Sequence, residues 1–155
     1  MVPGSVWWVR KMTEPQIIVR TCVFPQDYPA IYALWEKAGS GIHLRRSDEP
    51  EEIAKKLQRD PDLFLVAELD SQIIGSVLGG FDGRRGIMYH LAVSEAYRKQ
   101  GVGTLLTNEL ERRLQQKGCI RYYLLVTTDN QDAISFYERQ GWERMELYAY
   151  AKNLS

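Results

Sequence analysis

The sequence predicts one domain of the mixed α/β class, spanning residues 16–155 around a twisted sheet. Three observations support this prediction. The chain has 155 residues, of which 45% are hydrophobic, and this is enough to bury one core without disulfide bonds. Short β-branched segments alternate with segments whose apolar residues recur at helical spacing. The chain contains no internal repeat, low-complexity tract or linker at which it would divide.

The N-terminal part is predicted to open with a strand followed by two helices. Residues 17–23 are rich in β-branched side chains, which favour strands. Asp27 is suited to cap the helix that follows, because its carboxylate can accept a hydrogen bond from a free N–H of the first turn. Asp48 and Glu51 have the spacing of a capping box, which predicts a second helix through Leu57.

The remaining elements follow from the same two patterns. Strand patterns cover residues 63–69, 72–81, 87–93, 122–127 and 142–151, and helix patterns cover residues 102–117 and 130–140. The element order is therefore β-α-α-β-β-β-α-β-α-β, with four helices.

Composition and charge exclude several classes of function. Lys and Arg together number 20, as do Asp and Glu, so the chain lacks the basic excess of a general nucleic-acid binder or a polybasic membrane-surface protein. No apolar run approaches the roughly 18 residues of a membrane span. Two cysteines are too few for a disulfide framework or a zinc site, so we expect free thiols, no metal and a cytoplasmic protein. Residues 1–15 are expected to be an extension or a tag-like segment.

A glycine-rich turn after the strand at residues 87–93 is the most informative feature. Gly101 and Gly103 open the long helix, and the N–H groups at a helix N-terminus are unpaired and carry partial positive charge. Arg98 and Lys99 add positive charge beside them. The turn therefore predicts a phosphate or pyrophosphate cradle. It is neither a P-loop nor a dinucleotide fingerprint, because it lacks the Gly-Lys-Ser/Thr of the first and the third glycine of the second.

Two motifs in this region resemble those of the GNAT family of N-acetyltransferases. The pattern Arg98-x-x-Gly101-x-Gly103, after Leu91-Ala92-Val93, is similar to the family's motif A. The pattern Asn130-x-x-Ala133-x-x-x-Tyr137-Glu138-x-x-Gly141-Trp142 is similar to its motif B. The stretches at residues 63–68 and 79–86 further resemble the small stand-alone bacterial members called YpeA-type acetyltransferases. The resemblance covers residues 17–151 and implies a sheet of six to seven strands whose fourth and fifth strands splay apart.

The resemblance also implies a cofactor and the residues that hold it. Acetyl-CoA would place its pyrophosphate on the cradle and its peptide-like arm along the edge of the strand that ends at residue 93. The cofactor-binding residues implied in this way are Leu91, Ala92, Val93, Arg98, Lys99, Gln100, Gly101, Val102, Gly103, Thr104, Asn130, Ala133 and Tyr137.

Tyr137 is the catalytic residue that the resemblance implies. In the family, the tyrosine at this position is the usual general acid, and an ordinary tyrosine pKa of about 10 keeps it protonated at neutral pH. The alternative is a core tyrosine whose hydroxyl caps a backbone group.

No general base is evident: Leu125 stands where some family members carry a glutamate, and other members use a Glu or His on the fourth strand, where this chain has Tyr89 and His90. Glu68 and Asp82 are further candidates, and no base is needed if the amine arrives neutral. Strand alternation sends Tyr89 and His90 to opposite faces unless a bulge intervenes, so only one of them would point at the acceptor. The family geometry favours the side of Tyr89, which implies a packed role for His90.

The acceptor site is predicted from two loops. The loop after the first helix lines this site in the family, and Arg45 could clamp a carboxylate on the acceptor there. Asp82, Arg85 and Tyr89 are further candidate substrate-binding residues. A solvated charged loop and a rigid glycine turn explain the charged candidates as well.

The function that these observations favour is an N-acetyltransferase that moves an acetyl group from acetyl-CoA to a primary amine of a small molecule by direct transfer. The alternatives are a protein N-terminal or lysine acetyltransferase and a non-catalytic acyl-CoA-binding module. The resemblance also implies a homodimer formed through the C-terminal segment, although core packing explains the apolar residues there equally well.

Overall fold

The computed structural model describes residues 15–155. The proposed N-terminal extension therefore lies outside the described residues, apart from residue 15. The contacts within the chain define two units, one that ends at Leu125 and one that comprises Val126–Ser155. We describe each unit by itself.

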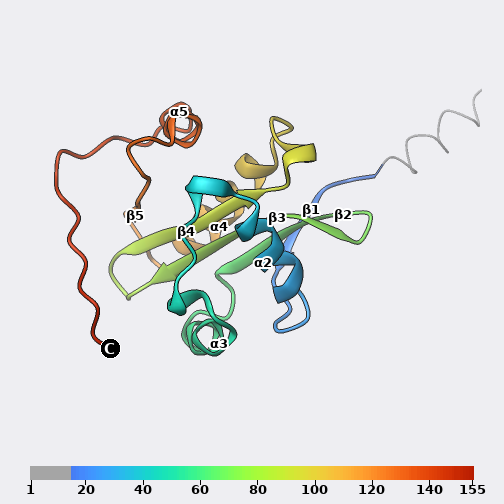
Figure 1. Cartoon of the computed structure of the whole chain (residues 1–155), viewed down its shortest axis with the longest axis horizontal. Coiled ribbons are helices and arrows are strands. Elements are labelled where there is room, and N and C mark those ends of the chain that lie inside the picture. The colour runs from blue at the N-terminus through green and yellow to red at the C-terminus, as the bar shows by residue number, and fades with distance from the viewer. Residues whose placement is uncertain (1–14) are drawn as a thin grey trace, which may run out of the picture. The chain divides into compact units, whose positions relative to one another are not determined.

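The first unit is built on one twisted sheet (Figure 1). Its strands lie in chain order: β1 (Ile18–Thr21), β2 (Phe64–Leu69), β3 (Gln72–Phe81), β4 (Gly86–Val93) and β5 (Tyr122–Leu124). Neighbouring strands are antiparallel except β4 and β5, which are parallel. The strand patterns of the sequence correctly predicted all five, with ends that differ by no more than a few residues.

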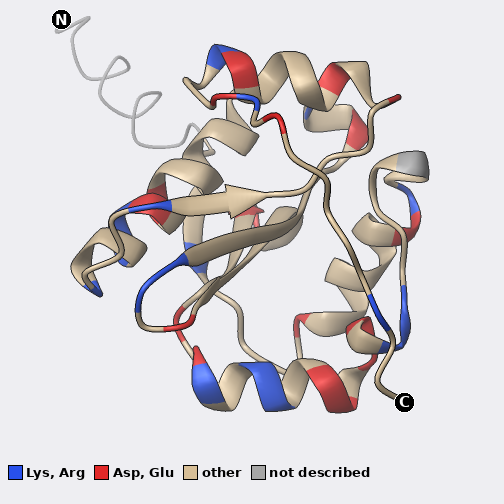
Figure 2. Cartoon of the chain, turned by 90° about the vertical axis from the view of Figure 1, so that its left-hand side faces the viewer, with Lys and Arg blue, Asp and Glu red and all other residues tan. Residues whose placement is uncertain are grey.

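Within residues 15–155, three α-helices belong to this unit and one to the second. They are α2 (Tyr28–Glu36), α3 (Pro50–Arg59), α4 (Val102–Gln116) and, in the second unit, α5 (Gln131–Arg139). Lys, Arg, Asp and Glu lie mainly on the helices and turns, whereas the strands carry few of them (Figure 2). Within residues 15–155, no helix combines the length and the apolar character that crossing a membrane requires.

Helices α2 and α4 cover opposite faces of the sheet. The indole of Trp35 on α2 stacks on the Phe64 ring of β2, with 6.0 Å between centroids and 7° between planes. Both side chains are fully buried in a cluster that also contains Leu78 of β3. Gly79, the next residue along β3, faces Leu110 of α4 instead. This arrangement follows from the period of two in a strand, which sends successive residues to opposite faces.

The close approach of α4 to β3 depends on Gly79. A Cβ built there would lie 2.4 Å from Cδ1 of Leu110, a fully buried side chain. We expect Gly79→Ala to reduce the free energy of unfolding by about 1–3 kcal/mol, the usual cost of overpacking a core. Urea unfolding measures this loss. The matched control is Gly80→Ala, whose Cβ comes no closer than 3.3 Å to any side chain, and an equal loss in both variants would contradict the explanation.

The expected sheet of six to seven strands is wrong in number. Five strands are present in residues 15–155, and the predicted strand at residues 142–151 is not among them. This segment follows α5 without regular structure, and its apolar residues Leu147, Tyr148 and Tyr150 are exposed. Strand-like composition alone does not make a strand, because a strand also needs a hydrogen-bonded neighbour.

The predicted capping box at Asp48 and Glu51 is also wrong. Helix α3 begins at Pro50, and its N-cap is Glu49, whose side chain forms no capping hydrogen bond. The Asp48 carboxylate lies in a preceding 3₁₀ turn, Arg46–Asp48, where Oδ2 accepts a hydrogen bond from the Arg45 N–H at 2.9 Å. The other carboxylate oxygen of Asp48, Oδ1, faces His90 of β4.

Candidate active site

The glycine turn connects β4 to α4, as the sequence predicted. Between them lies a 3₁₀ turn, Glu95–Tyr97, and the backbone then turns through left-handed conformations at Lys99 (φ 63°) and Gly101 (φ 83°). A Cβ at Gly101 would meet no atom within 4 Å, so the space beside this residue is open. The first backbone hydrogen bond of the helix runs from the Leu105 N–H to the Gly101 carbonyl. The open space and the start of the helix together fit an anion such as a pyrophosphate.

The side of β4 that faces β5 is open next to this turn. Strand β5 pairs only with Gly86–Met88, at the beginning of β4. From Tyr89 to Val93, in the part of the chain that the structure describes, β4 pairs on its other side alone, with β3. The two strands thus separate after Met88, and a peptide-like chain has a free edge with which to pair. The edge fits the pantetheine arm of acetyl-CoA.

Arg98 connects the open edge of β4 with the glycine turn through a hydrogen bond. Its Nε donates a hydrogen bond of 3.1 Å to the carbonyl of Val93, the last residue of β4, and the rest of the exposed side chain lies beside the turn. This bond anchors a positive charge where the predicted pyrophosphate would bind.

Replacing Arg98 should weaken cofactor binding without unfolding the protein. We expect Arg98→Ala to raise the Kd for acetyl-CoA about tenfold, or about 1.4 kcal/mol, because one charge-assisted contact is lost. Isothermal titration calorimetry measures the change, with Arg112→Ala, on α4 away from the turn, as the control. A Kd that changes equally in the two variants would show that only the net charge matters.

A β-bulge interrupts β4 where the open edge begins. The register with β3 shifts between Ser76 and Leu78, and His90 adopts a left-handed backbone with a φ of 45°. As a result the rings of Tyr89 and His90 lie near each other, with centroids 6.5 Å apart. These two side chains therefore do not lie on opposite faces, because a bulge intervenes, adds a residue and breaks the strand alternation.

His90 is held by Asp48. The distance between His90 Nε2 and Asp48 Oδ1 is 2.7 Å, and the imidazole also packs against the Trp35 ring with centroids 5.0 Å apart. Burial alone would raise the pKa of the Asp48 carboxyl, but the hydrogen bonds from His90 and from the Arg45 N–H outweigh it and the pKa is lowered. Asp48 is therefore an ionised carboxylate at neutral pH, and it connects the Arg45 loop to β4.

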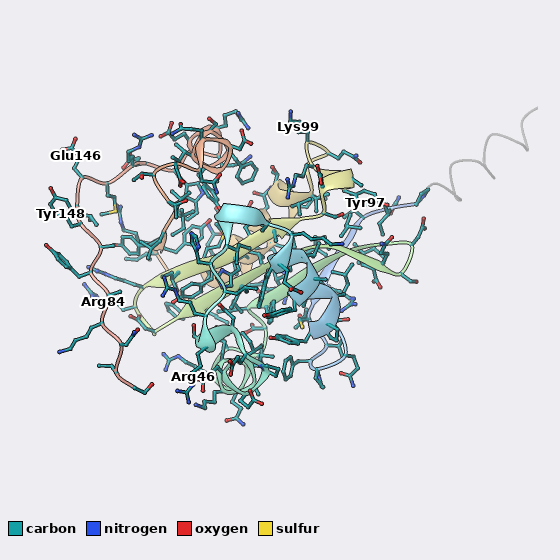
Figure 3. All side chains as sticks on the ribbon, in the orientation of Figure 1. Arg46, Arg84, Tyr97, Lys99, Glu146 and Tyr148 are labelled. Atoms are coloured by element: carbon teal, nitrogen blue, oxygen red, sulfur yellow. The ribbon has the colours of Figure 1, made fainter. Side chains whose placement is uncertain are left out.

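The predicted acceptor residues fall into two groups. Arg45 and Tyr89 lie close to the Asp48–His90 pair, through the contacts just described. Asp82 and Arg85 belong to the turn before β4, where Asp82 Oδ1 accepts the N–H of Arg85 at 2.7 Å. Figure 3 labels the neighbouring Arg84 and, beyond the other end of β4, Lys99. Arg45 and Tyr89 therefore lie near the bulge in β4, whereas Asp82 and Arg85 lie in the turn that precedes this strand.

The second unit contains the other motif. Asn130 caps α5, with its Oδ1 accepting the N–H of Ala133 at 3.2 Å. Tyr137 is seven residues further on, so it shares a helix face with both. Its ring packs edge-on against Trp142, with centroids 5.9 Å apart, and burial raises its pKa to about 12. Within residues 15–155, its hydroxyl makes no backbone hydrogen bond of the kind that the alternative role requires.

Asp48 is the residue that sequence reasoning missed. Its spacing predicts a helix cap, and the family geometry favours a packed role for His90 over a role as base, so neither pattern predicts their pairing. The available signal was weak, because the two residues are 42 positions apart and only the bulge brings their side chains together.

Comparisons with known proteins agree with this geometry. The acetyltransferase (GNAT) family matches residues 28–142. An acetyltransferase of Pectobacterium atrosepticum is 40% identical over 134 residues, which cover 85% of this chain and 93% of the relative.

Two solved structures have the same fold at low sequence identity. An aminoglycoside N-acetyltransferase in complex with CoA superposes with a TM-score of 0.72 at 17% identity, over 100% of both chains. The NatC complex bound to Gag peptide and CoA gives 0.72 at 21% identity, over 84% of this chain and 87% of that one. The family match and the curated relative, together with the cradle and open edge, lead to one conclusion. The chain belongs to the GNAT family of acetyltransferases, and acetyl-CoA is its acetyl donor.

Proposed function

We propose that this enzyme acetylates a primary amine of a small molecule by direct transfer from acetyl-CoA. The observation that carries the proposal is residue 125, which follows β5. It is a leucine with 74% of its surface exposed, where the family resemblance places a glutamate in some members. Replacement of that carboxylate weakens the case for a protein N-terminal acetyltransferase. The shared fold with an aminoglycoside N-acetyltransferase is consistent with a small acceptor.

In the proposed reaction the chain supplies binding groups and a proton. Acetyl-CoA brings an activated acetyl thioester. The turn at Gly101 binds its pyrophosphate, and the free edge of β4 from Tyr89 to Val93 holds the arm by backbone hydrogen bonds. Tyr137 keeps its proton at neutral pH, because its pKa is about 12, and donates it to the sulfur that leaves.

The test combines binding with turnover. Calorimetry with acetyl-CoA is followed by a thiol-release assay over aminoglycosides, polyamines, free amino acids and peptides with a free N-terminus or an internal lysine. We expect at least one small amine to be acetylated with a higher kcat/KM than any peptide. A peptide preference would establish a protein acetyltransferase instead. Binding without thiol release for every amine would identify an acyl-CoA-binding module.

Arg45 is proposed to contact a carboxylate on the acceptor. We expect Arg45→Ala to raise KM about tenfold for amines that carry a carboxylate, since a charge-assisted hydrogen bond contributes about 1.5 kcal/mol. The KM for acetyl-CoA should stay the same. Amines without a carboxylate are the matched control, measured with the same variant. If both classes of amine lose affinity equally, Arg45 stabilises its loop and does not contact the acceptor.

A further inference from the structure

Lys56 points from α3 into the protein, which is uncommon for a lysine. Its side chain is 19% exposed, and Nζ lies 2.6 Å from Oδ2 of Asp60, four positions further along the chain. Burial lowers the pKa of the ammonium, although the hydrogen bond to Asp60 opposes this shift. A lysine and an aspartate at this spacing usually form a solvated pair on a helix surface, whereas this pair has little contact with water.

The C-terminal end of α3 is anchored to the last residue of β3. Oδ2 of Asp60 also accepts a hydrogen bond of 3.4 Å from the Phe81 N–H, and the Arg59 guanidinium donates to the Phe81 carbonyl at 3.2 Å. Two successive residues at the end of the helix therefore hold both backbone groups of one strand residue. These contacts fix the position of the Lys56 ammonium relative to the sheet.

The ammonium lies over β3 beside Tyr89 of β4. A Cβ built on Gly80 would lie 3.7 Å from Lys56 Nζ and 3.8 Å from Cε2 of Tyr89, so both side chains border the bare backbone of this glycine. An ammonium has three donors, of which Asp60 takes one. No second hydrogen bond of this group is found in residues 15–155, so its remaining donors are available to a ligand beside Tyr89, a side chain that is itself 43% exposed.

These groups lie on the face of the sheet that remains for an acceptor. Successive residues of β3 alternate, so Gly80 shares the α2 face with Leu78, whereas Gly79 faces α4. Tyr89 pairs directly with Leu78 and therefore lies on the α2 face as well. The turn that fits the cofactor pyrophosphate opens α4, which covers the opposite face. The acceptor therefore approaches the free edge of β4 from the side of α2, α3 and Tyr89.

We propose that Lys56 is a specificity-determining residue whose ammonium donates a hydrogen bond to a hydroxyl or carbonyl oxygen of the acceptor amine. This inference rests on the proposed function, since it names a substrate class for the same site. The structure favours an uncharged oxygen, because an anion at the ammonium would also face the Asp60 carboxylate, which is 7% exposed. The same carboxylate offsets the repulsion between Lys56 and a positively charged acceptor. The substrate class is therefore a small amine that carries a hydroxyl or amide group.

The kinetic test compares pairs of acceptors that differ in one group. Amino alcohols of graded length are measured against alkylamines in which a methyl group replaces the hydroxyl. In the wild type, kcat/KM should be about tenfold higher for the best amino alcohol than for its alkylamine, within the range of one hydrogen bond to a charged group. Lys56→Gln should abolish this preference, while kcat/KM for the alkylamine and the Kd for acetyl-CoA stay within threefold of their wild-type values. A merely structural role would lower both rates alike.

Lys55→Gln is the matched control, because Lys55 is the neighbouring lysine of α3, its side chain is 70% exposed and it pairs with Glu52. This variant should keep the wild-type preference. If Lys56→Gln does not fold, the double variant Lys56→Met with Asp60→Asn removes both charges and leaves no unpaired carboxylate. It should also lose the preference. A wild-type preference in a folded Lys56 variant would overturn the proposal, as would an amino acid carboxylate that depends on Lys56 more strongly than the hydroxyl does.

A binding measurement separates this inference from the proposed function. In the complex with CoA, the ¹H–¹⁵N signal of the Lys56 ammonium, assigned with Lys56→Gln, should shift when the amino alcohol is added and much less with the matching alkylamine. If no amine is acetylated in the thiol-release assay, the proposed function fails, while this spectrum still decides whether the ammonium contacts a hydroxyl. A Lys56 signal that is unchanged at saturating amino alcohol would overturn the proposal.

Discussion

A Tyr137→Phe variant should turn over at least a hundredfold more slowly than the wild type while it binds acetyl-CoA with unchanged affinity. General acids contribute about 10²–10⁴ in rate, and phenylalanine retains the ring while removing the only proton that the side chain can give. The ring that packs against Trp142 is retained, so the fold should be preserved. Thiol release under saturating acetyl-CoA measures kcat, and calorimetry measures the Kd.

Two controls separate proton donation from packing. Phe136→Leu changes the neighbouring ring, whose centroid lies 5.3 Å from the centroid of the Tyr137 ring. This variant should have a much smaller effect on kcat than Tyr137→Phe. The deficit in Tyr137→Phe should shrink for an acyl donor whose leaving thiolate is less basic, because such a thiolate needs no proton. Unchanged turnover in Tyr137→Phe would remove this residue from the mechanism.

Trp35→Ala should cost about 3–5 kcal/mol of unfolding free energy, the range typical of a buried tryptophan. The side chain is fully buried, stacks on Phe64 and also contacts the His90 ring. Domains of this kind are stable by only about 5–15 kcal/mol, so the variant should lose a large share of its stability. Urea unfolding measures the loss.

Trp35→Phe is the matched control for this prediction. It keeps an aromatic ring on Phe64, and it removes an indole N–H that has no partner within residues 15–155. Removing an unpaired buried donor offsets part of the lost packing, so the cost should be less than half that of alanine. Equal losses in the two variants would show that the aromatic contacts contribute little.

Local patterns predicted most of the fold. The face of α4 is an example, since Val102, Leu106, Leu110 and Leu114 recur at helical spacing and are all buried. The glycine turn could be predicted from the sequence equally well, because its conformation depends on residues adjacent in the chain. In both cases the interactions that determine the structure lie within one element or its immediate neighbour.

The remaining features depend on contacts between distant residues. Asp48 has the spacing of a helix cap, yet its carboxylate gains two partners by pairing with His90 and the Arg45 N–H. The bulge at His90 arises from the register between β3 and β4, and no local residue signals it. For residues 142–151, the apolar pattern gives a propensity for strand but does not supply a pairing partner.

The bulge in β4 limits which partners can pair with the open edge of this strand. A strand with an open edge is a template on which identical chains can stack into aggregates. The left-handed residue at His90 breaks the regular spacing of donors and acceptors along that edge, so a straight strand from another molecule cannot pair along it in register. A short ligand arm needs only the few residues that follow, Leu91 to Val93. The irregularity thus leaves the edge open to a short ligand arm while it hinders pairing with a straight strand of another molecule.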